Sequence, residues 1–244
     1  MKRFLLFLSF FACAVACLGE VPTGSAEELY EGKEYSKAFA NPVDDPDLPN
    51  VLLIGDSISI GYTVDVRKQL HGKADVFRIP ENGKYTAYGL ENIDKWLGKR
   101  KWDVIHFNWG LWDICYRNPE SKTQGNRDKK AGTLTTTPEA YGKNLEAILV
   151  KLKQTGASLI WCATTPVPEF ELGRNVGDEV KYNEIAAEIM GRHEVSTDDL
   201  YAHALGKLPE IKIANGDVHF TKEGYRYLAE EVSRVISLKL KEQK

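Results

Sequence analysis

A serine stands where an apolar strand is expected to end and a helix to begin. The run VLLIG at residues 51–55 leads directly into Asp56 and Ser57, and a helical pattern follows. The first backbone N–H groups of a helix have no intrahelical partner and, together with the helix dipole, favour negative charge beside them. A hydroxyl at that point suits nucleophilic chemistry, but serine is also among the commonest helix caps. On its own, the position of Ser57 leaves both interpretations open.

Polar or small residues also follow the other expected strands. They are Gly83 after the second strand, Asn108 at the end of the third, Thr165 after the fourth and His219 before the last helix. In an open parallel sheet the carboxyl ends of the strands share one edge, and ligands bind there. Residues spread over more than 160 positions are therefore expected to converge on Ser57. This convergence favours an active site over a simple helix cap.

Short apolar runs alternate with amphipathic helical patterns, which predicts a parallel sheet wrapped by helices. Strands are expected at residues 51–55, 75–79, 104–109, 158–163 and near 195. Helices are expected at residues 58–70, 86–97, 138–154, 177–191 and 221–238. The segment 114–137 is long for a connection, and long ordered loops in compact domains usually form functional rims or lids.

The blocks around these strand ends resemble one known family. LLIGDSISIGY, at residues 52–62, is similar to the first block of the SGNH hydrolases, also called GDSL esterases and lipases, and later blocks follow in that family's order. The resemblance covers roughly residues 50–239. It implies a single flavodoxin-like three-layer α/β/α domain with a mostly parallel five-stranded sheet. It also implies hydrolysis of a carboxylic ester through a serine nucleophile, with no metal and no organic cofactor. The G-x-S-x-G elbow of the α/β-hydrolases does not fit, since residues 55–59 read GDSIS.

Carried over onto this sequence, the family's nucleophile falls on Ser57, whose backbone N–H would be the first donor to the oxyanion. GKYTAYGL resembles the second block and places a further backbone donor at Gly83. The third block departs from the usual G-x-N-D, because residues 110–113 read GLWD. The third donor is therefore either the side-chain amide of Asn108, which we prefer, or the indole N–H of Trp112.

The family's base falls on His219, with Asp217 as the acid that orients it. The usual spacing is D-x-x-H, whereas here a single residue separates the two side chains. In an extended segment residues i and i+2 point to the same side, roughly 6.5 to 7 Å apart at Cα, which a carboxylate and an imidazole can bridge. The shorter spacing is therefore compatible with a catalytic triad. The other four histidines lack such a setting, although His106 shares a strand face with Asn108 and is a candidate supporting residue.

Aromatic residues gather around the expected site, and flat aromatic faces suit the C–H surfaces of a sugar ring. The residues predicted to line the substrate pocket are Tyr85, Trp109, Trp112, Tyr116 and Thr165. The first interpretation is a carbohydrate O-acetylesterase acting on a small-molecule or polysaccharide ester. A lysophospholipase, thioesterase or short-chain lipase is the alternative, because the same aromatics could line an acyl groove. A catalytically silent relative that binds glycans also stays open, although the triad positions and Gly83 are intact.

The composition is that of an ordinary globular protein. Of 244 residues, 43% are hydrophobic and 27% are charged, which excludes collagen-like, disordered and polytopic membrane proteins. With 32 basic and 35 acidic side chains the net charge is −3, so the chain supplies no basic field for a polyanion. Nucleic acid is therefore not expected as a partner.

The first residues have the pattern of an export signal. Lys2 and Arg3 precede an uncharged run at residues 4–15, which is too short for a membrane span of about 20 residues. Residues 1–16 are therefore predicted to be a signal peptide. Ala14-Val15-Ala16 fits ordinary cleavage, whereas AVAC ending at Cys17 resembles a bacterial lipoprotein box, and both outcomes stay open. The mature protein is expected to be secreted, periplasmic or anchored to a bacterial membrane through a lipid on Cys17.

Three further segments complete the predicted organisation. Residues 17–49 are polar, contain four prolines and are interpreted as an N-terminal arm or tether, residues 50–239 as the hydrolase domain and residues 240–244 as a charged tail. Cys115 and Cys162 are expected to be buried free thiols rather than a disulfide, and no cysteine or histidine spacing suggests zinc.

Overall fold

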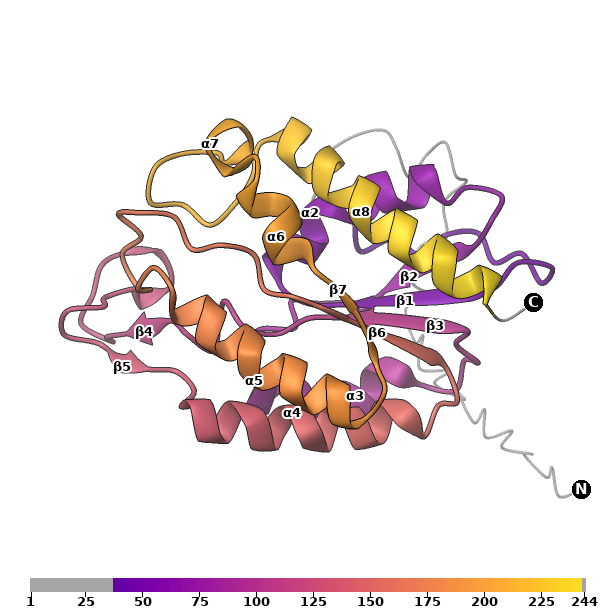
Figure 1. The fold of residues 1–244 in the computed structure, drawn as a ribbon, viewed down its shortest axis with the longest axis horizontal. Coiled ribbons are helices and arrows are strands. Elements are labelled where there is room, and N and C mark those ends of the chain that lie inside the picture. Colours follow the sequence, from indigo (N-terminus) through magenta and orange to yellow (C-terminus); the bar gives the residue numbers. More distant parts are fainter. Residues whose placement is uncertain (1–36, 243–244) are drawn as a thin grey trace, which may run out of the picture.

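A five-stranded sheet forms the centre of the molecule (Figure 1), in a computed structural model that describes residues 37–242. Its strands are β1 (Asn50–Ile54), β2 (Asp75–Arg78), β3 (Val104–Phe107), β6 (Ser158–Cys162) and β7 (Ser196–Asp198). Their order is β2-β1-β3-β6-β7, and every neighbouring pair is parallel. This is the strand order of flavodoxin-like folds, so the predicted three-layer α/β/α fold is confirmed.

Helices cover both faces of the sheet. On one face lie α2 (Ser57–Gln69), α6 (Leu200–Leu205), α7 (Leu208–Ile211) and α8 (Lys222–Lys241), and on the other lie α3 (Thr86–Leu97), α4 (Pro138–Lys153) and α5 (Asp178–Arg192) (Figure 1). Because both faces are covered, the central strands are continuous apolar runs, and the four residues from Val51 to Ile54 are at most 1% exposed. The five predicted helices are confirmed to within three residues at each end. The short helices α6 and α7 were not predicted, because six and four residues are too few to show a helical period.

The long segment after β3 folds over the carboxyl edge of the sheet. It contains the two-residue strands β4 (Tyr116–Arg117) and β5 (Thr133–Leu134), with the short helix η2 (Gln124–Asn126) between them. The loop that follows β6 lies against it, since the Tyr116 N–H donates to the Gly173 carbonyl at 2.6 Å and the Lys129 N–H to the Leu172 carbonyl at 2.9 Å. Together these two loops form the rim seen at the left of Figure 1.

The predicted signal peptide and Cys17 lie outside the described residues, as do the last two residues of the predicted charged tail. The described part of the N-terminal arm runs along the domain. Arg67 donates to the carbonyls of Lys37 and Ala38 at 2.9 and 3.2 Å, and the Asp45 N–H donates to the Asp75 carboxylate at 2.6 Å. Among residues 37–242, none of the helices has the length and apolar character needed to cross a membrane.

Candidate active site

The start of α2 holds Ser57 at the carboxyl end of β1. The helix is capped by Asp56, whose Oδ1 accepts the N–H of Ile58 at 2.9 Å. Burial raises the pKa of Asp56, and the bond from Ile58 opposes that shift. Because Asp56 serves as the cap, Ser57 is not needed for it, and the Ser57 hydroxyl is left for chemistry. The backbone N–H of Ser57, in the first turn of the helix, has no acceptor among the described residues.

Ser57, His219 and Asp217 form one chain of hydrogen bonds. The Ser57 Oγ lies 2.9 Å from the His219 Nε2, and the His219 Nδ1 lies 2.6 Å from the Asp217 Oδ1. The same carboxylate oxygen accepts the backbone N–H of His219 at 3.0 Å. Burial opposes ionisation of Asp217, but these two bonds from His219 outweigh it and hold the pKa of Asp217 below its ordinary value. The short D-x-H spacing therefore places the Asp217 carboxylate where it can orient His219 and balance the charge of its imidazolium form.

Arg78, the last residue of β2, holds the serine loop in place. The residue is 5% exposed, and its guanidinium donates to the carbonyls of Gly55 and Asp56 at 2.8 and 3.1 Å and to the Ser59 hydroxyl at 2.7 Å. A buried charge needs such partners, because desolvation without them is costly. Sequence reasoning missed Arg78. The available signal was an arginine at the end of an otherwise apolar strand.

Two of the expected oxyanion donors are engaged elsewhere. The Gly83 N–H donates to the Gly55 carbonyl at 2.9 Å, and a Cβ at Gly83 would lie 2.9 Å from that oxygen. The Asn108 amide donates to the Cys162 carbonyl at 2.7 Å and to the Thr164 hydroxyl at 3.3 Å, which ties β3 to the end of β6. Neither N–H is left for a substrate in this structure. The close approach of the two backbones explains why residue 83 is a glycine. The two bonds to Cys162 and Thr164 explain why residue 108 carries an amide.

A cavity of about 430 Å³ opens over the triad. Its wall includes Trp112, as predicted, and Leu111 beside it. Sequence reasoning missed the other polar residues of the wall, which are Asn82, Arg117, Gln124, Arg127 and Arg174. Asn82 is the neighbour of Gly83, so the second block was identified correctly but the residue that reaches the cavity is one position earlier. The arginines lie in the two rim loops, whose conformations have no periodic signal in the sequence.

The other four predicted pocket residues do not line this cavity. Trp109 is fully buried, and its indole N–H donates to the Gly83 carbonyl at 3.0 Å. Tyr85 packs against Tyr88 at the start of α3, with ring centroids 6.2 Å apart. Tyr116 pairs in the rim hairpin, and Thr165 is 3% exposed beside a separate small void. Most of the predicted aromatic lining is therefore structural.

Asp113, the last residue of the third block, joins the sheet edge to α3. Its Oδ1 accepts the Thr86 N–H at 2.9 Å and the Thr86 hydroxyl at 2.7 Å, at the first residue of α3. The side chain is fully buried, and this burial raises the pKa of Asp113 from 3.8 to about 6 despite these bonds. The second and third blocks of the site are thus held together by one carboxyl group.

The raised pKa of Asp113 predicts a pH-dependent stability. Because the pKa of Asp113 is higher in the folded than in the unfolded protein, ionisation of this carboxyl group destabilises the fold. The contribution of Asp113 to the free energy of unfolding is therefore fully present below the unfolded pKa of 3.8 and is lost as the pH rises through about 6. The loss is about 3 kcal/mol. Asp113→Asn keeps an acceptor for Thr86 but cannot ionise. The unfolding free energy of the variant minus that of the parent should therefore be about 2 to 3 kcal/mol larger at pH 7.5 than at pH 4. Urea denaturation at the two pH values measures this, and a difference that does not change with pH would contradict it.

The predicted supporting residue His106 belongs to a different cluster. Its Nε2 lies 2.9 Å from the Asp198 Oδ2, both side chains are fully buried, and the Cys162 sulfur is close to them. These residues come from β3, β7 and β6, and none of them lines the cavity over Ser57. Cys115 and Cys162 are buried free thiols, as predicted.

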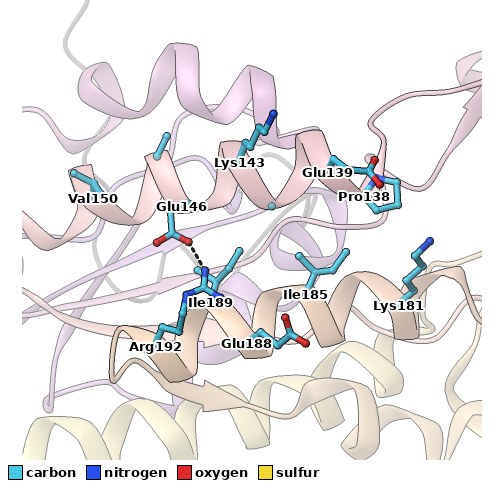
Figure 2. A pocket seen from close by; sticks show the side chains of 12 residues that line it. Pro138, Glu139, Lys143, Glu146, Val150, Lys181, Ile185, Glu188, Ile189 and Arg192 are labelled. Atoms are coloured by element: carbon cyan, nitrogen blue, oxygen red, sulfur yellow. Dashed lines mark hydrogen bonds and ion pairs between the residues drawn. The ribbon is translucent and has the colours of Figure 1, made fainter.

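A larger hollow of about 760 Å³ lies between α4 and α5, away from the triad (Figure 2). Charged side chains line it together with Ile185 and Ile189, and Glu146 accepts from Arg192 at 2.7 Å across it. No triad residue contributes to its wall. Size alone therefore does not mark the active site of this protein.

Several solved structures share the fold. An acetyl xylan esterase called AlAXEase is 18% identical and has a TM-score of 0.60, with 77% of this chain and 99% of that chain covered. A lipase/acylhydrolase from Enterococcus faecalis is 20% identical with a TM-score of 0.63, covering 77% and 95%. An acetylxylan esterase from Geobacillus stearothermophilus is 16% identical with a TM-score of 0.62, covering 77% and 94%. None of the curated protein sequences matches the chain significantly.

A family model matches residues 53–227, which is most of the chain and spans the region from β1 into α8. The matched segment includes all three triad positions and the rim. Its match agrees with the resemblance of the first block and with the fold of the esterases and lipases above. The protein is an ester-bond hydrolase and belongs to the GDSL-like lipase/acylhydrolase family.

Proposed function

We propose that the protein is an exported serine esterase that removes short acyl groups, acetyl above all, from carbohydrate esters. The observation that carries the catalytic part is the hydrogen-bond chain from Ser57 through His219 to Asp217 on the wall of an open cavity. The sugar preference is supported by the polar residues of that cavity wall and by the aromatic Trp112 among them. Acetyl xylan esterases of the same fold support it as well.

The mechanism follows from the positions of the three side chains. Neutral His219 accepts the proton of Ser57 through Nε2 while the Ser57 Oγ attacks the ester carbonyl. Asp217 keeps the proton on Nδ1 and balances the imidazolium that forms. Collapse of the tetrahedral intermediate breaks the bond to the sugar oxygen, which takes the proton from His219 and leaves. Water, activated by the same histidine, then hydrolyses the acyl-serine to release the acid and restore the enzyme.

The oxyanion needs donors near Ser57, and we propose three N–H groups of residues that line the same cavity. One is the backbone N–H of Ser57 at the start of α2. The second is the side-chain amide of Asn82, whose Oδ1 accepts the Lys84 N–H at 2.9 Å while the amide N–H groups have no acceptor among the described residues. The third is the indole N–H of Trp112, which likewise has no acceptor within residues 37–242. We assign Asn82 and Trp112 as the donors that replace Gly83 and Asn108.

This assignment predicts how single substitutions act. Asn82→Ala should lower kcat by about 100-fold with a smaller effect on KM, because a donor aimed at the transition state acts on kcat. Trp112→Phe, which removes only the N–H and part of the ring, should also lower kcat. Asn108→Ala should instead lower the melting temperature, since it leaves the Cys162 carbonyl unpaired. Steady-state kinetics and thermal melts of the three variants measure this, and the assignment is wrong if only Asn108→Ala loses kcat on a stable fold.

A lipase or lysophospholipase function is less well supported. An acyl chain needs an apolar groove, and beyond Leu111, Trp112, Gly125 and Val218 the side chains that line the cavity are polar or charged. The comparison that tests the choice is acetate release from acetylated xylan and pectin oligosaccharides against fatty-acid release from a lysophospholipid. We expect acetate to be released at least about tenfold faster at equal substrate concentration. Fatty acid released faster than acetate would favour the lipase.

Export is part of the same proposal. It is supported by the basic residues and apolar run at the N-terminus, and lipid attachment by Cys17 after Ala14-Val15-Ala16. Expression of the full chain in a bacterial host, followed by mass measurement of the mature N-terminus, tests it. A mature chain that begins at Cys17 with added acyl mass indicates a lipoprotein, and one that begins at Cys17 without added mass indicates secretion. A chain that keeps residues 1–16 would contradict export.

A further inference from the structure

Three arginines line the cavity that holds Ser57 and His219. Arg117 and Arg127 come from the rim segment after β3, and Arg174 comes from the loop after β6. A guanidinium presents a planar fork of N–H donors that matches carboxylate, sulfate and phosphate oxygens. A neutral acetylated sugar has no negative charge that could pair with these three guanidinium groups. The question is which of the three is available to a ligand.

Two of the arginines are tied to one buried carboxylate. Glu171 is 1% exposed, and its Oε1 accepts from Arg127 Nη1 at 2.9 Å and from Arg174 Nη1 at 3.0 Å. Arg174 also donates through Nε to the Leu111 carbonyl at 2.5 Å. These bonds hold the two rim loops together. The single charge of Glu171 balances only one of the two guanidinium groups.

Arg117 has a different setting. Among residues 37–242 no carboxylate lies within 4.0 Å of its guanidinium nitrogens, and its contacts are the Gly125 carbonyl and the Trp112 ring, whose centroid lies 4.4 Å away. Burial, with Arg174 and Arg127 nearby, lowers the pKa of Arg117, but a guanidinium stays protonated in proteins. Arg117 is thus a half-buried cation that lies over an aromatic ring at the cavity wall.

The acidic residues of the wall do not neutralise it. Asp217 is bound to His219, and Asp56 caps α2. Both belong to the triad end of the site and are engaged there. The rim therefore keeps an unmatched positive charge in a partly enclosed cavity, where an ionic contact is stronger than in open water.

We propose that Arg117, supported by Trp112 and by the neighbouring Arg127 and Arg174, binds a carboxylate of the substrate, so that the esters cleaved best are carried by acidic sugars. This rests on the proposed esterase function and narrows its substrate class. An acidic sugar seated with its carboxylate on Arg117 would place an acylated hydroxyl toward Ser57 within the same cavity. Neutral xylan, by contrast, would leave the guanidinium unpaired.

The test compares two small acetyl esters that differ in charge, 4-acetoxybenzoate and 4-acetoxybenzamide. The quantity measured is the ratio of their kcat/KM values, so that any general loss of activity cancels. Arg117→Gln should lower the acid-to-amide ratio by about tenfold or more, mainly through KM, because the charge-assisted hydrogen bond to the carboxylate is lost while the neutral amide loses little. Arg117→Lys, which keeps the charge, should restore part of the ratio.

Arg100 is the matched control. Its guanidinium also lies over an aromatic ring, 4.1 Å from the Phe77 centroid, but it precedes β3 at the opposite edge of the sheet and pairs with Asp44 at 2.8 Å. Arg100→Gln should leave the acid-to-amide ratio unchanged. An acid-to-amide ratio that is the same for the parent protein, Arg117→Gln and Arg100→Gln would overturn the inference while leaving the esterase function standing.

Binding is measured apart from turnover so that the two proposals fail separately. In the Ser57→Ala protein, galacturonate should raise the melting temperature more than galactose does, and the added Arg117→Gln change should abolish that difference. Galacturonate and galactose that act alike on the Ser57→Ala protein would overturn the inference. A protein that binds galacturonate through Arg117 but releases no acetate from any ester would instead keep the anion site and contradict the esterase.

Discussion

Ser57→Ala is expected to lower kcat/KM for every ester the enzyme cleaves by about 10⁴-fold or more, with the melting temperature changed by no more than a few degrees. The loss is large because no other hydroxyl is hydrogen-bonded to His219 in the described structure. The fold is spared because Asp56, not Ser57, caps α2, so the substitution removes only the bond to His219. Initial rates with an activated acetyl ester and a thermal melt of the same preparation measure both effects.

The matched control for this variant is Ser237→Ala. Ser237 lies on α8 and does not line the cavity, so its loss should leave both kcat/KM and the melting temperature near those of the parent. If Ser57→Ala kept the turnover of the parent, the nucleophile would have to be another group. If it lost activity and also unfolded, the melt would show it, and Ser57→Gly would repeat the kinetic test.

His219→Ala and Asp217→Asn should also cause large losses, and these losses should not add. Because the two residues act as one catalytic unit, replacing either of them already removes most of what the unit contributes. The kcat/KM of the double variant should therefore be little lower than that of the slower single variant. In Asp217→Asn the amide can hold the imidazole in the wrong tautomer and cannot balance its charge, which predicts a loss of about 10³- to 10⁴-fold at neutral pH. The remaining activity should rise toward high pH, because a route that uses hydroxide or deprotonated serine takes over.

Profiles of kcat/KM against pH for the two single variants and the double variant measure this. The asparagine keeps an acceptor for the His219 backbone N–H, so the loop should keep its shape. Losses that multiply in the double variant, or an Asp217→Asn enzyme with a normal profile, would mean that a group other than Asp217 orients the base.

The fold could be predicted from the sequence because its signals are local and repeated. The strands β1, β3 and β6 are mostly apolar and buried. The helices α3, α4 and α8 each carry an apolar stripe, as in the buried Leu145, Ile148, Leu149 and Leu152 of α4. Ser57 was predictable for a related reason, because it directly follows β1 at the edge of the sheet where parallel strands end together. The roles of His219 and Asp217, which precede α8, were predicted from the resemblance to the SGNH hydrolases.

The donors and the pocket wall could not be predicted in the same way. Whether Asn108 or Asn82 reaches the cavity depends on hydrogen bonds to the end of β6, which lies more than 50 residues away from Asn108 in the sequence. The position of the Arg174 side chain depends on its ion pair with Glu171. Glu171 also pairs with Arg127, which lies in the other rim loop. These contacts join irregular segments, and no periodicity specifies them.

The most direct measurement of the central claim is the site of attack by an organophosphorus fluoride that forms a stable ester with an activated serine. Intact mass and peptide mapping should show one adduct, on the peptide that contains Ser57. Labelling should be absent in Ser57→Ala and at least about 100-fold slower in His219→Ala, because His219 activates the hydroxyl. An adduct on a different residue, or hydrolysis of esters by a protein that never becomes labelled at Ser57, would contradict the account.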